Sequence, residues 1–290
     1  MQEVKDRAAT VPPFVLVIAA VLLWSTGGLF IKLTSLDPYQ LTFFRSLLAA
    51  ITVILLTYKR GLRINGFGLL GSVFYAVLLF LFVWATKQTT AANAIFLQYT
   101  APIYILILGP FLIGERFHWR DLVTIVCCLA GMSLFFVGEL EISDYQGNLA
   151  ALTSGVFFGL YMLLLRHPRA QGMNSTITVI YGNLMLALVT LPSGISALSV
   201  MTVLDVLAVA FLGIVQIGIA YILFIKGVTG GTRPLDASII GFIEPLLNPV
   251  WVFLIIGERP SAWAILGGAV IITTVAAHTI AQYRRRGEAI

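Results

Sequence analysis

Long runs of apolar residues alternate with short polar segments along the whole chain. Each run has about 20 residues, which is the length that a helix needs to cross about 30 Å of hydrocarbon. The runs lack the alternation of apolar and polar residues that the strands of a membrane barrel would have. Ten runs can be counted, at 14–35, 38–57, 66–86, 91–113, 119–138, 145–166, 175–193, 204–226, 236–256 and 261–282. The pattern predicts an all-α integral membrane protein with ten transmembrane helices.

The segments between the runs are only a few residues long and contain turn-forming residues, such as Asp37-Pro38 and Gly230-Gly231. They leave no room for a folded domain outside the membrane. The Gly230-Gly231 loop also lacks the lysine and the spacing of a phosphate-binding loop. An ATP-driven pump is therefore not expected.

Composition supports the same class of protein. The 290 residues are 59% apolar and only 11% charged, whereas ordinary soluble domains are near half apolar and about a quarter charged. Soluble enzymes and disordered scaffolds are therefore excluded. The net charge of +5 comes from basic residues scattered over short loops, so we expect a lipid bilayer and no nucleic acid as partner.

The positions of lysine and arginine predict the orientation, because cytoplasmic loops of membrane proteins are enriched in both. With the N-terminus in the cytoplasm, fourteen of the eighteen basic residues lie inside, three lie outside and Arg45 is buried. The opposite orientation would reverse this ratio. We therefore expect a multi-pass protein of the cytoplasmic membrane with both termini in the cytoplasm.

The chain contains an internal repeat. The segment with Pro102 and Gly114-Glu115-Arg116 resembles the segment with Pro245 and Gly257-Glu258-Arg259, 143 residues later. This spacing divides the chain into two five-helix repeats, 1–142 and 143–290, which together form one membrane domain. Five is odd, so the second repeat is inverted in the membrane. Inverted repeats of this kind underlie alternating access around a site near the midplane.

These features together resemble the EamA family of the drug/metabolite transporter superfamily. The resemblance rests on the 5+5 layout, Trp24-Ser25 in the first run, Arg45 in the second run and the paired Pro…Gly-Glu-Arg segments, and it covers nearly the whole chain. It implies a ten-helix transporter of small organic metabolites, often an exporter. Amino-acid and metabolite exporters are one branch of the superfamily, and uptake carriers for small cations such as choline are more distant relatives.

Glu244 is the sharpest candidate for a functional residue, because a carboxylate near the centre of a membrane span is costly. Asn248 and Trp251 follow it by four and seven residues, so the three share one helix face. In the functional interpretation, Glu244 binds a cationic group or carries a proton. In the structural interpretation, neighbouring helices cap Glu244 and it only fixes packing.

Arg45 is the one basic residue predicted to be buried in the membrane. Its planar guanidinium suits bidentate recognition of a substrate carboxylate. It could equally form an ion pair with Glu244, or cap carbonyl groups freed at Pro102 or Pro245. The sequence leaves these roles open.

Further polar and aromatic residues lie at mid-depth in several runs. Singly, each is explained by hydrogen bonding or packing between helices, but their common depth predicts a polar midplane cavity. The predicted substrate-binding residues besides Glu244, Asn248, Trp251 and Arg45 are Trp24, Gln98, Tyr99, Tyr161, Asn183 and Gln216, and the predicted hinges are Pro102, Pro245 and Pro249.

The sequence thus predicts a secondary carrier that exports amino acids or related zwitterionic and aromatic metabolites by alternating access. The alternative is an uptake or exchange carrier for small organic cations such as choline or amines. A membrane scaffold or an intramembrane enzyme is less favoured, because the three histidines lie at or near span ends and no nucleophile–base pair is present. We expect a monomer with a small-molecule substrate and no cofactor or metal, although a proton could be coupled to transport.

Overall fold

The structure is a computed structural model that describes residues 11–89, 91–135, 137, 144–256 and 261–287. Within these residues every regular element is a helix. The helices of the first half are α1 (Pro13–Trp24), α2 (Gly27–Leu33), α3 (Pro38–Thr57), η1 (Tyr58–Arg60), α4 (Gly66–Gln88), α5 (Ala91–Gln98), α6 (Ala101–Leu112) and α7 (Trp119–Phe135). The helices of the second half are α8 (Tyr145–Arg166), η2 (Pro168–Ala170), α9 (Ile177–Val189), α10 (Leu191–Ala197), α11 (Val203–Ala210), η3 (Phe211–Ile219), α12 (Ala220–Thr229), α13 (Pro234–Gly241), α14 (Ile243–Ile256) and α15 (Ala262–Gly287).

Several of these helices can cross a membrane. Seven helices of the described residues are long and apolar enough, and the pair α9 and α10, bent by 65°, makes an eighth if it is one span. The runs at 119–138 and 236–256 are outside this count, because α7 has 17 described residues and the second run is divided between α13 and α14. The prediction of an all-helical membrane protein is confirmed, whereas the number of ten spans stays a prediction.

Local sequence signals explain where the helices begin. Asp37 accepts hydrogen bonds from the backbone of Tyr39 and Gln40 and caps α3. Thr202 and Asp205 form the same kind of reciprocal cap on α11. These caps satisfy backbone N–H groups that have no partner inside the helix.

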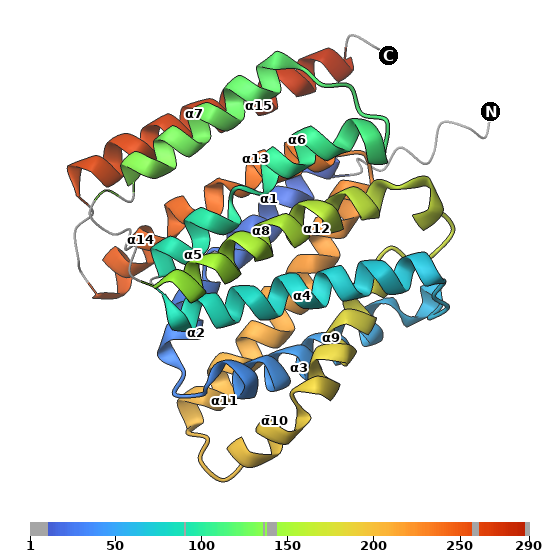
Figure 1. Ribbon diagram of the computed structural model, residues 1–290, viewed down its shortest axis with the longest axis vertical. Coiled ribbons are helices and arrows are strands. Elements are labelled where there is room, and N and C mark those ends of the chain that lie inside the picture. Colours follow the sequence, from blue (N-terminus) through green and yellow to red (C-terminus); the bar gives the residue numbers. More distant parts are fainter. Residues whose placement is uncertain (1–10, 90, 136, 138–143, 257–260, 288–290) are drawn as a thin grey trace, which may run out of the picture.

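The loops gather at two opposite ends of the helices, as alternating spans require. At the predicted cytoplasmic end, Asn174 donates to the carbonyl of Gly61 at 3.1 Å, and the rings of Phe14 in α1 and Tyr283 in α15 lie 5.8 Å apart. At the other end, Ser35 donates its backbone N–H to Asp205 at 2.8 Å. The first and last described helices therefore begin and end on one side of the molecule (Figure 1). Which side faces the cytoplasm stays a prediction.

The two spans with paired prolines are both broken at their middle. The first is α5 and α6, interrupted at Tyr99 and Thr100, and the second is α13 and α14, interrupted at Phe242. Tyr99 and Phe242 are 143 residues apart, so they are equivalent positions of the repeat. Their ring centroids are 5.2 Å apart, which means that the two broken spans cross at their breaks.

Pro102 and Pro245 lie in the first turn of α6 and α14, immediately after these breaks. Proline is tolerated there because its missing N–H would have no partner inside the helix. The prolines therefore fix where the second half of each broken span begins. Their role as hinges stays a prediction, and the side chain of Pro249 lies outside the described residues.

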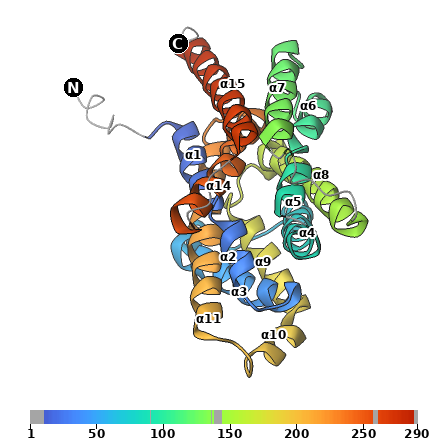
Figure 2. The same cartoon turned by 90° about the vertical axis from the view of Figure 1, so that its left-hand side faces the viewer.

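Further helices lie at both ends of the molecule and between them. The helices α7 and α15 pack along each other at one end of the molecule, and α10 and α11 lie at the opposite end (Figures 1 and 2). Between them, α4 and α8 pack together beside α5. Glycine in α8 permits this contact, since a Cβ at Gly155 would lie 2.8 Å from the carbonyl oxygen of Gln98.

We predict that Gly155→Ala destabilises the protein, because the added methyl group would push α8 away from the break in the fourth span. Overpacking of this kind costs about 1–3 kcal/mol. The measurement is the unfolding temperature of the purified protein in detergent. Gly66→Ala in α4 is the matched control, since a Cβ there meets nothing within 4 Å. Equal unfolding temperatures for the two variants would contradict the close approach.

Candidate functional site

A small cavity lies beside the crossing of the broken spans. Five of the predicted substrate-binding residues line it, namely Trp24, Arg45, Gln98, Gln216 and Glu244. The other lining residues are Leu78, Leu79, Phe82, Phe158, Ile217 and Tyr221. The cavity therefore has one basic and one acidic side chain, besides uncharged polar groups, on an otherwise apolar and aromatic wall.

Arg45 of α3 is 2% exposed, and its Nη1 has no hydrogen-bond partner among the described residues. Among the described residues, Arg45 forms no ion pair with Glu244 and no hydrogen bond to a backbone carbonyl at a helix break. Two of the roles that the sequence left open are thus not realised in this structure. A buried polar group without a partner is costly and rare in folded proteins.

Close packing of α3 on η3 brings Arg45 to the cavity. A Cβ at Gly213 of η3 would lie 2.8 Å from the carbonyl oxygen of Arg45, so only glycine permits this approach. The same π-helical segment carries Gln216. Helices with i→i+5 hydrogen bonds are rare and occur frequently at functional sites.

Two further polar atoms at the cavity are buried without a partner among the described residues. They are Nε1 of Trp24 and Oε1 of Gln216. Gly27 gives Gln216 the space it occupies, because a Cβ at Gly27 would lie 2.5 Å from the amide nitrogen of Gln216. The Trp24 ring is held by Tyr221 and Phe224, each with its ring centroid 4.8 Å away.

Glu244 lies on the first turn of α14, on the opposite side of the break from α13. Its Oε2 accepts a hydrogen bond of 2.7 Å from the hydroxyl of Tyr99. Tyr99 is itself 5% exposed and lies at the break of the other broken span. The bond therefore joins one residue of each repeat. Gln98, next to Tyr99, donates to Ser154 of α8 at 2.7 Å.

Three predicted residues do not line this cavity and bond elsewhere. The Tyr161 hydroxyl bonds to Thr178 at 3.0 Å, Asn183 donates to the Tyr75 hydroxyl at 3.0 Å, and Trp251 donates to Ser25 at 3.0 Å. These three hydrogen bonds link helices to one another, as polar side chains in membranes commonly do. The side chain of Asn248 lies outside the described residues.

Comparison with known proteins identifies the family. The EamA-like transporter family matches the chain over residues 12–137 and 145–279. The chain belongs to the EamA-like transporter family. The family resemblance inferred from the sequence is thus confirmed, and this EamA-like protein is a membrane transporter with several spans.

Its relatives match over most of their length. An uncharacterized transporter of Archaeoglobus fulgidus is 25% identical over 93% of this chain and 98% of its own. The uncharacterized transporter YdfC of Bacillus subtilis is 25% identical over 86% of this chain and 85% of its own. The pseudopaline exporter CntI of Pseudomonas aeruginosa is 23% identical over 82% of this chain and 84% of its own. One crystal structure shares the fold with a TM-score of 0.78 at 22% identity, and covers 92% of this chain and 97% of the other.

Sequence reasoning missed the aromatic and aliphatic half of this EamA-like site. Phe158 and Tyr221 line the cavity beside Trp24, but aromatic residues are common in membrane spans and these two had no polar neighbour to single them out. Tyr221 follows Gln216 by five residues, a spacing that shares a face only where the helix is π-helical. The apolar pattern of the run at 204–226 does not reveal such a segment.

We predict that Arg45→Met leaves the transporter as stable as the wild type or raises its unfolding temperature in detergent. The reason is that Arg45 loses no ion pair and no hydrogen bond with the described residues, whereas breaking a buried ion pair costs about 3–5 kcal/mol. Asp205→Ala is the control that should unfold earlier, since Asp205 accepts hydrogen bonds from Ser35 and Thr202. A fall for Arg45→Met as large as that of the control would assign Arg45 a structural role.

Proposed function

We propose that this protein is a secondary transporter that exports amino acids or related zwitterionic, often aromatic, metabolites across the cytoplasmic membrane. The observation that carries the proposal is that Arg45 and Glu244 line one cavity without forming an ion pair. Two opposite charges held apart in a membrane protein fit a ligand that has both.

The unpartnered polar atoms suggest how such a ligand binds. The ligand carboxylate accepts hydrogen bonds from Arg45 and from Nε1 of Trp24, both of which are donors. The ligand ammonium donates to Glu244 and to Oε1 of Gln216, both of which are acceptors. An apolar or aromatic side chain of the ligand packs against Phe158 and Tyr221. Each buried polar atom at the cavity would then have a partner.

Transport proceeds by alternating access in this proposal. The cavity lies beside the crossing of the two broken spans, so a rocking motion of one repeat against the other changes the side on which the cavity opens. Pro102 and Pro245 begin the second halves of the broken spans, and the angle between the halves changes there. One chain carries both repeats, so a monomer suffices.

Export is proposed from the relatives, because the repeat itself does not fix the direction of transport. The relative from Pseudomonas aeruginosa is named an exporter of pseudopaline. The distribution of basic residues supports the orientation with both termini in the cytoplasm. In this orientation the exporter takes its substrate from the cytoplasm.

The second candidate is a carrier for small organic cations, working by uptake or exchange. It is favoured by the position of Glu244 beside aromatic residues, with Tyr99 bonded to it at 2.7 Å and Tyr221 on the same cavity. A carboxylate and aromatic faces together bind quaternary ammonium groups. In this alternative Arg45 has no ligand group to bind, which is why we prefer the zwitterion.

A proton is the coupling ion that we propose, carried by Glu244. A proton on this carboxylate removes the cost of a charge at the centre of the membrane while the site crosses between its two open forms. The Tyr99 hydroxyl can turn to accept a hydrogen bond once Glu244 is protonated.

We predict that zwitterions stabilise the purified transporter in a thermal-shift screen of amino acids, amines, purines and quaternary ammonium compounds. Amino acids with aromatic or large apolar side chains should raise the unfolding temperature most, because they also contact Phe158 and Tyr221. Amines that lack a carboxylate should have a smaller effect. Stabilisation by cations alone would favour the second candidate function instead.

We predict that Glu244→Gln abolishes the part of transport that a pH gradient drives. The glutamine keeps the size of the side chain and a partner for Tyr99, but it cannot take up a proton. The measurement is substrate flux in proteoliposomes with and without a pH gradient, for the wild type and for Glu244→Gln protein shown to be folded. Full gradient-driven flux in the variant would show that Glu244 does not carry the coupling proton.

A further inference from the structure

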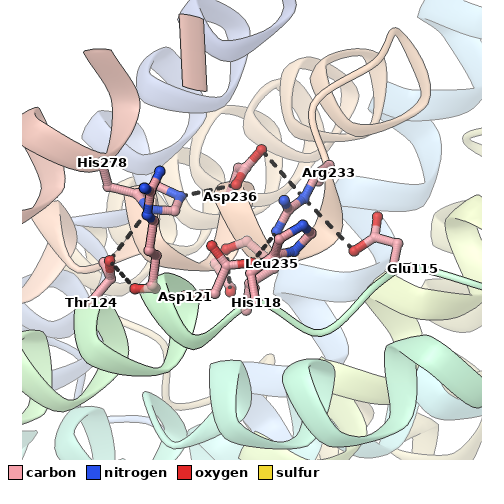
Figure 3. A network of polar contacts seen from close by, with 10 residues as sticks. Glu115, His118, Asp121, Thr124, Arg233, Leu235, Asp236 and His278 are labelled. Carbon is pink, nitrogen blue, oxygen red and sulfur yellow. Dashed lines mark hydrogen bonds and ion pairs between the residues drawn. The ribbon is translucent and has the colours of Figure 1, made fainter. Parts of the chain in front are cut away.

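A cluster of charged side chains ties the start of α13 to three other segments of the chain (Figure 3). Nη2 of Arg233 lies 2.7 Å from Asp121 of α7, and Nε of Arg233 lies 3.8 Å from Glu115 in the turn before α7. Asp236 of α13 in turn lies 2.9 Å from Nε2 of His278 on α15. We call these five residues the Arg233 cluster.

Three of the five residues of the Arg233 cluster are buried although they lie near the ends of the helices. Asp121, Asp236 and His278 are 2%, 5% and 8% exposed, whereas the side chains of Arg233 and Glu115 are 22% exposed. Burial raises the pKa of the Glu115 carboxyl above its usual value, and Arg233 opposes this shift. Burial lowers the pKa of Arg233, but the carboxylates of Asp236, Asp121 and Glu115 more than offset this, so that its pKa is raised. The guanidinium lies 2.7 Å from Asp121, 3.7 Å from Asp236 and 3.8 Å from Glu115, so it joins three carboxylates.

The position of the cluster links it mechanically to the cavity. Asp236 and Glu244 are eight residues apart on the same broken span, about 12 Å along a helix. The short helix α13 lies between them, with the Arg233 cluster at its start and the break at its end. A movement of α13 would therefore displace the cluster and the Glu244 region together.

The other broken span has a polar cluster at the equivalent place. Thr89 and Asn93 precede Thr232 and Asp236 by 143 residues, and they lie at the start of α5. Asn93 donates to Asn148 of α8 at 2.9 Å and to Thr89 at 3.1 Å. Because the repeats are inverted, this cluster lies at the predicted outer end, opposite the Arg233 cluster.

We propose that the Arg233 cluster is a latch that closes the cytoplasmic side of the cavity by holding α13 against α7 and α15. The latch opens when the cavity opens to the cytoplasm. The cluster of Thr89, Asn93 and Asn148 closes the outer side of the cavity in the same way and opens when the cavity opens outward. This proposal rests on the alternating access proposed above. Its basis is the burial of Asp121, Asp236 and His278, the place of the cluster at the start of a broken span and the matching cluster in the other repeat.

The test measures from which side a cysteine in the cavity can be labelled. Cys127 and Cys128 are first replaced by alanine, and Phe158→Cys then places one thiol on the cavity wall. A membrane-impermeant maleimide is added to the inner or to the outer face of sealed vesicles. The latch is weakened by the double substitution Arg233→Gln and Asp121→Asn, which removes one positive and one negative charge. Asn93→Ala with Asn148→Ala is the matched variant of the outer cluster.

We expect the inner double variant to raise the labelling rate from the cytoplasmic face about fivefold or more, the lower end of typical coupling energies. The outer double variant should raise labelling from the outer face instead. Unchanged inner labelling in folded Arg233→Gln, Asp121→Asn protein would overturn the latch. If that variant does not fold, exchange of the two charges by Arg233→Asp with Asp121→Arg should restore wild-type labelling, and failure to do so in folded protein would also overturn it.

The labelling needs no substrate, so the test separates the latch from the proposed substrate. Transport is measured in protein that keeps Phe158. A shift in labelling, with no amino-acid transport by that protein, would support the latch and contradict the substrate class. Amino-acid transport by that protein, with unshifted labelling, would support the substrate class and contradict the latch.

Discussion

The hydrogen bond from Tyr99 to Glu244 joins the two broken spans at the point where they cross. The bilayer core offers no water to a carboxylate or to backbone groups freed at a helix break, so both must find partners inside the protein. The crossing meets this need by placing the break of each repeat against the other, with Tyr99 and Phe242 in ring contact. The position of α13, the opening of the cavity and the place of Glu244 on its wall all depend on this contact.

The two repeats share a backbone plan but not their chemistry. The equivalent of Glu244 in the first repeat is Ala101, and the equivalents of Thr232 and Asp236 are Thr89 and Asn93. In both repeats the broken span has a polar cluster at its start. Only the second repeat has a charged residue, Glu244, at the middle of the span. This difference indicates that Glu244 is not required by the scaffold. The unpartnered state of Arg45 among the described residues points the same way.

Much of the fold could be predicted, because the bilayer imposes a length and an apolar composition on each span. Pro102 and Pro245, which the sequence predicts as hinges, lie just after the breaks at Tyr99 and Phe242. Polar residues in an apolar run are conspicuous, which is why the sequence predicts the cavity residues Trp24, Arg45, Gln98, Gln216 and Glu244. The same rule selects Tyr161, Asn183 and Trp251, but these bond to other helices. The sequence alone does not distinguish a residue that lines the cavity from one that links helices. The π-helical turn at Phe211–Ile219 and the joining of Arg233 to Glu115 and Asp121 depend on tertiary packing, which the sequence pattern does not encode.

We propose that Arg45 binds the carboxylate of the transported molecule. The direct measurement is the affinity of a stabilising amino acid and of its decarboxylated amine for the wild type and for Arg45→Gln, by calorimetry. A hydrogen bond to a charged group is worth about 1.5–3 kcal/mol, so loss of the carboxylate should weaken binding to the wild type about tenfold or more. The same loss should have little effect on binding to Arg45→Gln. An equal loss of affinity in both proteins would contradict the proposal.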